Sequence, residues 1–87
     1  MKVREIYEVE LTEQEMNYVK EVMKDYGAET NYSYDFDNNH YYLRASREKF
    51  HGLYIALRSA YRDYSDVEDE RTKTVRSIYY EISLIVK

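Results

Sequence analysis

The side chains that could do chemistry in this chain are few and scattered. His40 and His51 are its only histidines, and it contains no cysteine. His40 follows Asp37, with Asp35 close by, and a histidine beside carboxylates can act as a general base or a metal ligand. A polar turn residue explains the same pattern, because no second histidine stands at metal-ligand spacing. We therefore predict no catalytic residue, no metal site and no cofactor.

Other catalytic patterns are also missing from the 87 residues. Gly27 and Gly52 stand alone, so no glycine-rich loop is available to hold a phosphate. Ser46 lacks a partner base and is better explained as a helix cap. These features favour a protein that is not an enzyme and has no small-molecule substrate.

The chain shows no membrane or export signal. No apolar run approaches the ~20 residues of a membrane-spanning helix. The first ten residues alternate charged and apolar side chains, unlike a signal peptide. We predict a cytoplasmic protein that does not bind a membrane.

A basic stripe is the first candidate binding surface. On a helical wheel its members fall within about 80° of one another, beside the apolar side of the same helix. They are Arg47, His51, Ile55, Arg58 and Arg62. This stripe is either a solvated face whose arginine stems cover apolar surface, or a site for a protein or phosphate partner.

An acidic segment is the second candidate. The chain carries a net charge of −4, and acids crowd the stretch before the last apolar run. They are Asp63, Asp66, Glu68, Asp69 and Glu70. Such a segment either keeps the chain soluble, or imitates the phosphates of nucleic acid and occupies a basic groove on another protein.

Periodic patterns predict the elements that position these side chains. Alternating apolar and polar residues predict strands, and apolar residues three and four apart predict helices. The predicted strands cover residues 2–11, 29–36, 40–45 and 73–86, and the predicted helices cover 12–26 and 46–64.

Local signals mark several of these boundaries. Thr12 and Glu15 form a capping box, and Gly27 suits the left-handed residue that ends a helix. Ser46 can cap the second helix.

Asn38-Asn39 predicts a two-residue hairpin turn, because asparagine tolerates positive φ. This turn would place the apolar residues of both strands on one face. It would pair Asp37 with His40, Phe36 with Tyr41, Tyr34 with Leu43 and Tyr32 with Ala45.

The element order predicts an α+β fold in a single domain, residues 1–87. The order β-α-β-β-α-β resembles ferredoxin-like domains, in which a four-stranded antiparallel sheet carries two helices on one face. The alternative is a looser α+β domain whose last strand joins another subunit. Ferredoxin-like domains host many functions, so the resemblance implies none.

The free face of the predicted sheet is the third candidate surface, and we expect Ile6, Tyr42, Arg44 and Tyr79 on it. Aromatic side chains on central strands stack bases in RNA-binding sheets. Glu8 and Glu10 share this face and would repel phosphates. A homodimer, through this face or the last strand, is an equal alternative.

Together these patterns favour a non-enzymatic protein-binding module. The more specific hypothesis is a phage or mobile-element inhibitor, similar in kind to anti-CRISPR proteins. It would use an acidic surface to bind a protein with a basic nucleic-acid-binding surface. The alternative is a small RNA- or single-stranded-DNA-binding domain. It would use Tyr42 and Tyr79 on the sheet, or Arg47, Arg58 and Arg62 on the helix.

Overall fold

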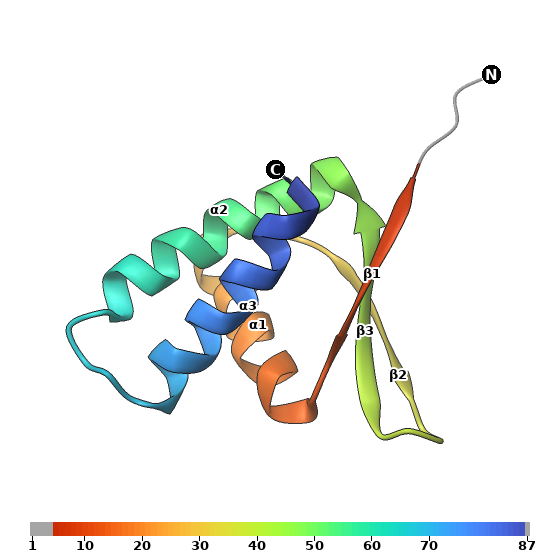
Figure 1. Cartoon of the computed structure of the whole chain (residues 1–87), viewed down its shortest axis with the longest axis horizontal. Coiled ribbons are helices and arrows are strands. Elements are labelled where there is room, and N and C mark those ends of the chain that lie inside the picture. Colours follow the sequence, from red (N-terminus) through yellow and green to blue (C-terminus); the bar gives the residue numbers. More distant parts are fainter. Residues whose placement is uncertain (1–4, 87) are drawn as a thin grey trace.

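The structure, a computed structural model, describes residues 5–86 as a small α+β fold with three strands and three helices. The predicted strand positions of residues 2–4 lie outside the described residues. In chain order the elements are β1 Ile6–Leu11, α1 Glu13–Tyr26, β2 Asn31–Asp35, β3 His40–Ser46, α2 Arg47–Tyr64 and α3 Glu70–Val86 (Figure 1).

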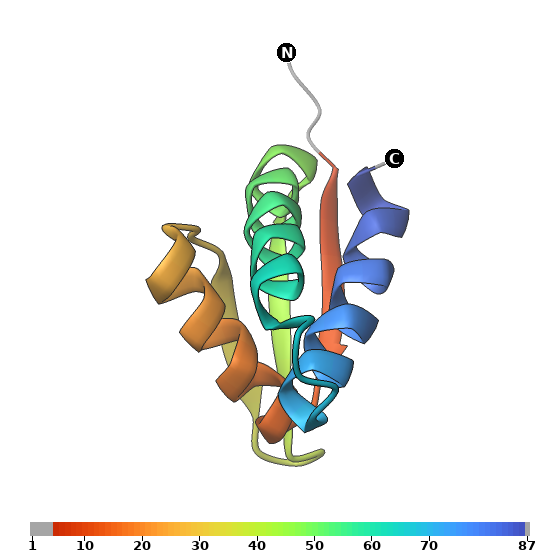
Figure 2. The ribbon, with the colours of Figure 1, turned by 90° about the vertical axis from the view of Figure 1, so that its left-hand side faces the viewer.

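The three strands form one antiparallel sheet in the order β1-β3-β2. All three helices cover the same face of this sheet, and the opposite face is left open (Figure 2). Alternation along the strands sends Leu11, Leu43 and Ala45 into the core beneath the helices. The predicted placement of both helices on one face is confirmed.

Both predicted helices form where their signals indicated. Thr12 and Glu15 exchange the two hydrogen bonds of a capping box at the start of α1. Gly27 ends α1 in the left-handed conformation, with φ of 72°. The hydroxyl of Ser46 accepts a hydrogen bond from the backbone N–H of Lys49, which caps α2.

The hairpin forms, but its predicted register is wrong by two residues. Tyr34 pairs with Tyr41, and Tyr32 pairs with Leu43. The turn therefore contains four residues and not two. An even shift keeps each side chain on its predicted face, which is why the alternation pattern alone could not reveal the error.

Asp35 explains the longer turn. Its carboxylate accepts hydrogen bonds from the backbone N–H of Asp37 at 3.0 Å and from the side-chain amide of Asn38 at 2.8 Å. This side-chain turn closes the loop before the strands could meet at Asn38-Asn39. Phe36, predicted to face the core, thus lies in the loop and is 86% exposed.

The last element is a helix, and the predicted strand over 73–86 is wrong. Ile78 and Ile82 are fully buried, whereas Tyr80 and Leu84 are 57% and 82% exposed. A strand would place all four side chains on one face. Burial of residues four apart is the pattern of a helix.

Local preference misled the sequence prediction here. The segment is rich in isoleucine, valine and tyrosine, which favour strands. Packing overrides this preference, because α3 lies against α2 and buries Val75, Ile78 and Ile82 together.

The prediction of a four-stranded ferredoxin-like sheet is therefore wrong, because the fourth strand is absent from the described residues. No described segment pairs with the outer edge of β1, where a fourth strand would lie. A homodimer built through a last strand loses its basis for the same reason. No helix within residues 5–86 combines the length and the apolar character that crossing a membrane requires.

Candidate binding surface

All five residues of the basic stripe lie exposed on α2, as the helical wheel predicted. They run along the side of α2 that faces away from the sheet. Ile55, near their middle, is 42% exposed. The stripe spans sixteen residues of a helix that rises about 1.5 Å per residue, so its charges extend over about 22 Å.

Tyrosines from α3 join this stripe, which the sequence did not predict. The ring of Tyr79 lies 5.2 Å from that of Tyr54 and 6.1 Å from that of Tyr61. Tyr80 stacks on Tyr79 at 5.4 Å and is more than half exposed. We define the arginine–tyrosine face as Arg47, His51, Tyr54, Ile55, Arg58, Tyr61, Arg62, Tyr79 and Tyr80.

The cations of this face have few partners within the described chain. The guanidinium of Arg58 lies over the Tyr54 ring at 5.8 Å, and the ring of His51 lies 6.2 Å from the same tyrosine. Arg47 donates a hydrogen bond of 3.0 Å to the backbone carbonyl of Val86. No described carboxylate lies within ion-pair distance of Arg47, Arg58 or Arg62. Their charge is therefore available to a partner.

Most acids of the predicted acidic segment serve the fold itself. Asp63 accepts a hydrogen bond of 2.5 Å from the hydroxyl of Tyr26. Glu68 forms an ion pair of 3.0 Å with Arg76. Glu70 lies in the first turn of α3, where its charge favours the helix end. Asp66 is exposed and has no such role among the described residues.

Asp69 begins α3. Its carboxylate accepts a hydrogen bond of 2.9 Å from the backbone N–H of Thr72, and this bond lowers the pKa of Asp69 below its ordinary value. The hydroxyl of the fully buried Thr72 lies 2.9 Å from the carbonyl oxygen of Tyr64, so the junction joins α2 to α3. Asp69 at the N-cap position, followed by the acidic Glu70 in the first turn, was the missed sequence signal for this helix.

Acids also gather around Tyr64, at the end of α2. Burial raises the pKa of Tyr64; the carboxylates of Glu21, Asp25 and Asp63 raise it further, whereas Arg71 lowers it. The hydrogen bond to Asp63 raises the pKa of the neighbouring Tyr26 to about 12. This acidic end combines residues from α1 and α2, and sequence proximity could not have shown it.

The open sheet face is polar and internally paired. Arg44 forms an ion pair of 3.3 Å with Glu8, and His40 lies against Glu10. Tyr42 lies on the central strand β3 and pairs with Glu10 of β1, and Ile6 is exposed at the start of β1. Tyr79, predicted on this face, is absent from it because it belongs to α3. The face therefore lacks the second aromatic ring that the base-stacking hypothesis required.

The described residues offer no metal-binding group. Within residues 5–86, no three histidine, aspartate or glutamate side chains come together in a way that could hold a metal ion. His40 and His51 lie on different elements, one on β3 and the other on α2.

Comparison with known proteins assigns no role to these surfaces. No family model matches the chain, and neither a curated protein nor a solved structure matches it. Any function must therefore be argued from the geometry of the surfaces themselves.

Proposed function

We propose that this protein is a non-enzymatic, cytoplasmic protein-binding module, and that the arginine–tyrosine face is its contact surface. The observation that carries the proposal is the row of exposed arginines without described carboxylate partners, beside the exposed side chains of Tyr80 and Ile55. Tyrosine and arginine are enriched at the centres of protein interfaces, where they contribute most of the binding energy.

The charge of this face defines the partner. Arg47, His51, Arg58 and Arg62 would be complemented by carboxylates on another protein. Arginine binds carboxylates through two parallel hydrogen bonds, which gives both strength and direction. We expect association to be accelerated by this complementarity and to slow as salt rises, because screening shortens the reach of exposed charges.

Affinity capture with two charge-neutralised variants tests the proposal. Changing Arg58 and Arg62 to Ser removes two positive charges from the face, and changing Asp66 to Asn and Glu70 to Gln removes two negative charges from the acidic segment. Thermal unfolding should show that both variants are folded. We expect the first variant to lose the captured partner and the second to retain it; the reverse result would reject the arginine–tyrosine face.

The acidic end supports a second candidate function. Three carboxylates, those of Glu21, Asp25 and Asp63, lie near Tyr64 on two helices, although Arg71 offsets part of their charge through an ion pair of 3.7 Å with Glu21. This supports the narrower proposal of an inhibitor, of phage or mobile-element type and anti-CRISPR-like, that occupies a basic nucleic-acid channel. In that case nucleic acid should compete with this protein for its partner.

Direct binding of nucleic acid is the outcome that would change the class of the function. The rings of Tyr79 and Tyr80 stack on each other beside the arginines. Proteins use such aromatic and cationic side chains to bind single-stranded nucleic acids. Mobility-shift measurements with labelled single-stranded RNA and DNA at low salt provide the test. Tight binding that weakens steeply with salt, and that the Arg58 and Arg62 changes abolish, would replace the protein-binding proposal.

A further inference from the structure

A groove runs beside the arginine–tyrosine face, between the end of α1 and the middle of α2. Its volume is about 410 Å³, within the ~300–1,000 Å³ range typical of ligand sites. The lining residues that matter for the argument below are Ala28, Glu29, Lys49, Gly52 and Ile55. Ile55 belongs to both surfaces, so the groove and the arginine stripe are continuous.

Gly52 lines the groove at a position in α2 where a glycine carries a conformational cost. A glycine inside an exposed helix is less favourable than alanine, because it loses more backbone freedom on folding. The space above Gly52 is empty, since no atom lies within 4 Å of the position that a Cβ would take. Neither helix packing nor backbone conformation therefore requires glycine here.

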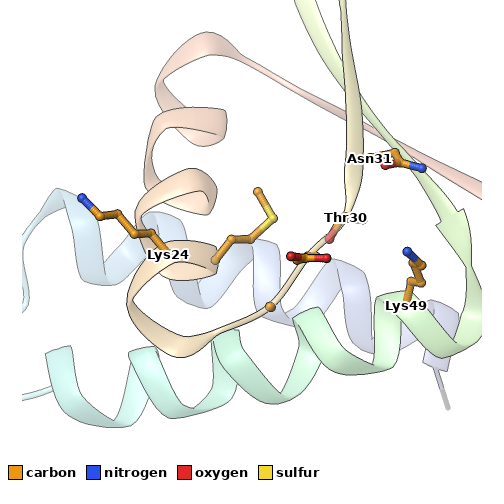
Figure 3. A pocket seen from close by; sticks show the side chains of 7 residues that line it. Lys24, Thr30, Asn31 and Lys49 are labelled. Carbon is orange, nitrogen blue, oxygen red and sulfur yellow. The ribbon is translucent and has the colours of Figure 1, made fainter.

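An adjoining hollow extends the groove toward β2. It has a volume of about 430 Å³ and shares Ala28, Glu29 and Lys49 with the groove. Figure 3 shows Lys49 extending from α2 toward Asn31, whereas Lys24 extends away from them.

Thr30 lines this hollow and is only 9% exposed. Its hydroxyl has no hydrogen-bond partner among the described residues. A buried hydroxyl without a partner is unfavourable, but the Thr30 oxygen is almost inaccessible to solvent, so it offers no hydrogen bond to an occupant of the hollow.

We infer that this groove receives an apolar side chain of an acidic segment of the partner protein. The inference rests on the proposed function, because the partner segment is expected to be acidic only if it binds the basic stripe beside Ile55. The groove itself carries one acid and one base, Glu29 and Lys49, and so adds shape and apolar contact. The stripe supplies exposed arginines without described carboxylate partners along the same helix. An apolar anchor with acidic flanks matches both features.

Selection from displayed random peptides tests the inference without a known partner. Peptides of random sequence are selected on the immobilised full chain. We expect the enriched sequences to carry a leucine, isoleucine or aromatic residue with aspartate or glutamate on either side. Enrichment of peptides that lack acids, or no enrichment, would overturn the inference.

Two substitutions at Gly52 provide the decisive comparison. Gly52→Leu should fill the groove and weaken the selected peptides about 10- to 100-fold, the effect of displacing one buried apolar side chain. Gly52→Ala adds a single methyl group and should change binding much less. Both should raise the midpoint of thermal unfolding, by about 2–8 °C, because both improve helix propensity. A loss of binding by Gly52→Leu therefore cannot be attributed to unfolding.

The stripe variant separates failure of the groove from failure of the proposed function. If Gly52→Leu binds the peptides as well as the unmodified chain, the groove is not the site. If Arg58→Ser with Arg62→Ser then still abolishes binding, the proposed function survives. If the peptides bind the Arg58→Ser, Arg62→Ser variant as tightly as the unmodified chain, the arginine–tyrosine face is not the contact surface. Capture of an oligothymidylate strand in place of peptides would overturn the inference.

Discussion

The acidic segment and the basic stripe are both rich in charged residues, but these charges make different contacts in the folded chain. Both are dense in charge, and both lie on or beside α2. The acids are engaged within the chain: Asp63 by a tyrosine, Glu68 by an arginine and Asp69 by a helix end. Arg58 and Arg62 have no ion-pair partner among the described residues.

This difference shows why charge density alone does not identify a binding surface. A charge that caps a helix or holds a neighbouring side chain contributes to folding and is partly neutralised there. A charge without such a partner keeps its full field for association. The comparison therefore favours the basic stripe as the binding surface, although the chain as a whole is acidic.

The largest expected effect concerns α3, on which both regions depend. Changing Ile82 to Asp would bury an unpaired charge, at a cost of about 3–5 kcal/mol, which is a large part of a small domain's stability. Leu84→Asp is the control, because this exposed position should tolerate a charge. Urea unfolding measures both. Equal effects at the two positions would mean that residues 73–86 form the strand of the original prediction.

The next effect tests whether the acidic segment is structural. Changing Asp69 to Ala removes the cap of α3 and should lower the free energy of unfolding by about 0.5–2 kcal/mol. Asp66→Ala removes the same charge from a residue without a described partner and should be nearly silent. If the two changes had the same effect, the contrast between capping and free acids would fail.

A pH dependence should follow from Tyr26. Its pKa of about 12 in the folded protein lies above the ordinary value of 10.0, so the protonated hydroxyl stabilises the fold. This contribution is complete below pH 10 and is lost as pH rises to 12. Tyr26→Phe should therefore flatten the fall in thermal stability over that window.

Asp63→Asn provides the matching variant for the titration of Tyr26. It removes the carboxylate that holds the tyrosine proton, so the pKa of Tyr26 should fall toward 10.0. Tyrosinate absorbance during an alkaline titration measures it. An unchanged titration would show that Asp63 is not engaged as the structure indicates.

The smallest effect is expected for the arginines. Arg58→Ser and Arg62→Ser should each change the free energy of unfolding by at most about 1 kcal/mol, because exposed charges contribute little to stability. Urea unfolding of the single variants measures this. A larger loss would mean that the stripe, like the acids, serves the fold.

The sequence predicted the first two helices and the faces of the strands because their signals are local. A capping box, a left-handed glycine and two-residue alternation each act within a few residues. The hairpin register failed because the side chain of Asp35 determined the turn, and an even shift leaves the alternation unchanged.

The prediction for the last element, a strand over residues 73–86, was wrong for a different reason. Residues 73–86 contain apolar side chains at both helical and strand spacing, and the choice is made by contact with α2. That error also hid the candidate surface. The basic stripe lies on one helix and could be predicted from it, but Tyr79 and Tyr80 reach it only through the packing of two helices.

Mapping of backbone amide chemical shifts, between the free protein and its complex with a captured partner, tests the central claim most directly. We predict that the largest changes fall on His51, Ile55, Arg58 and Arg62 of α2 and on Tyr80 of α3. Residues 63–70 should change little. Changes concentrated in residues 63–70, with α2 unaffected before Asp63, would contradict the account and assign the contact to the acidic segment.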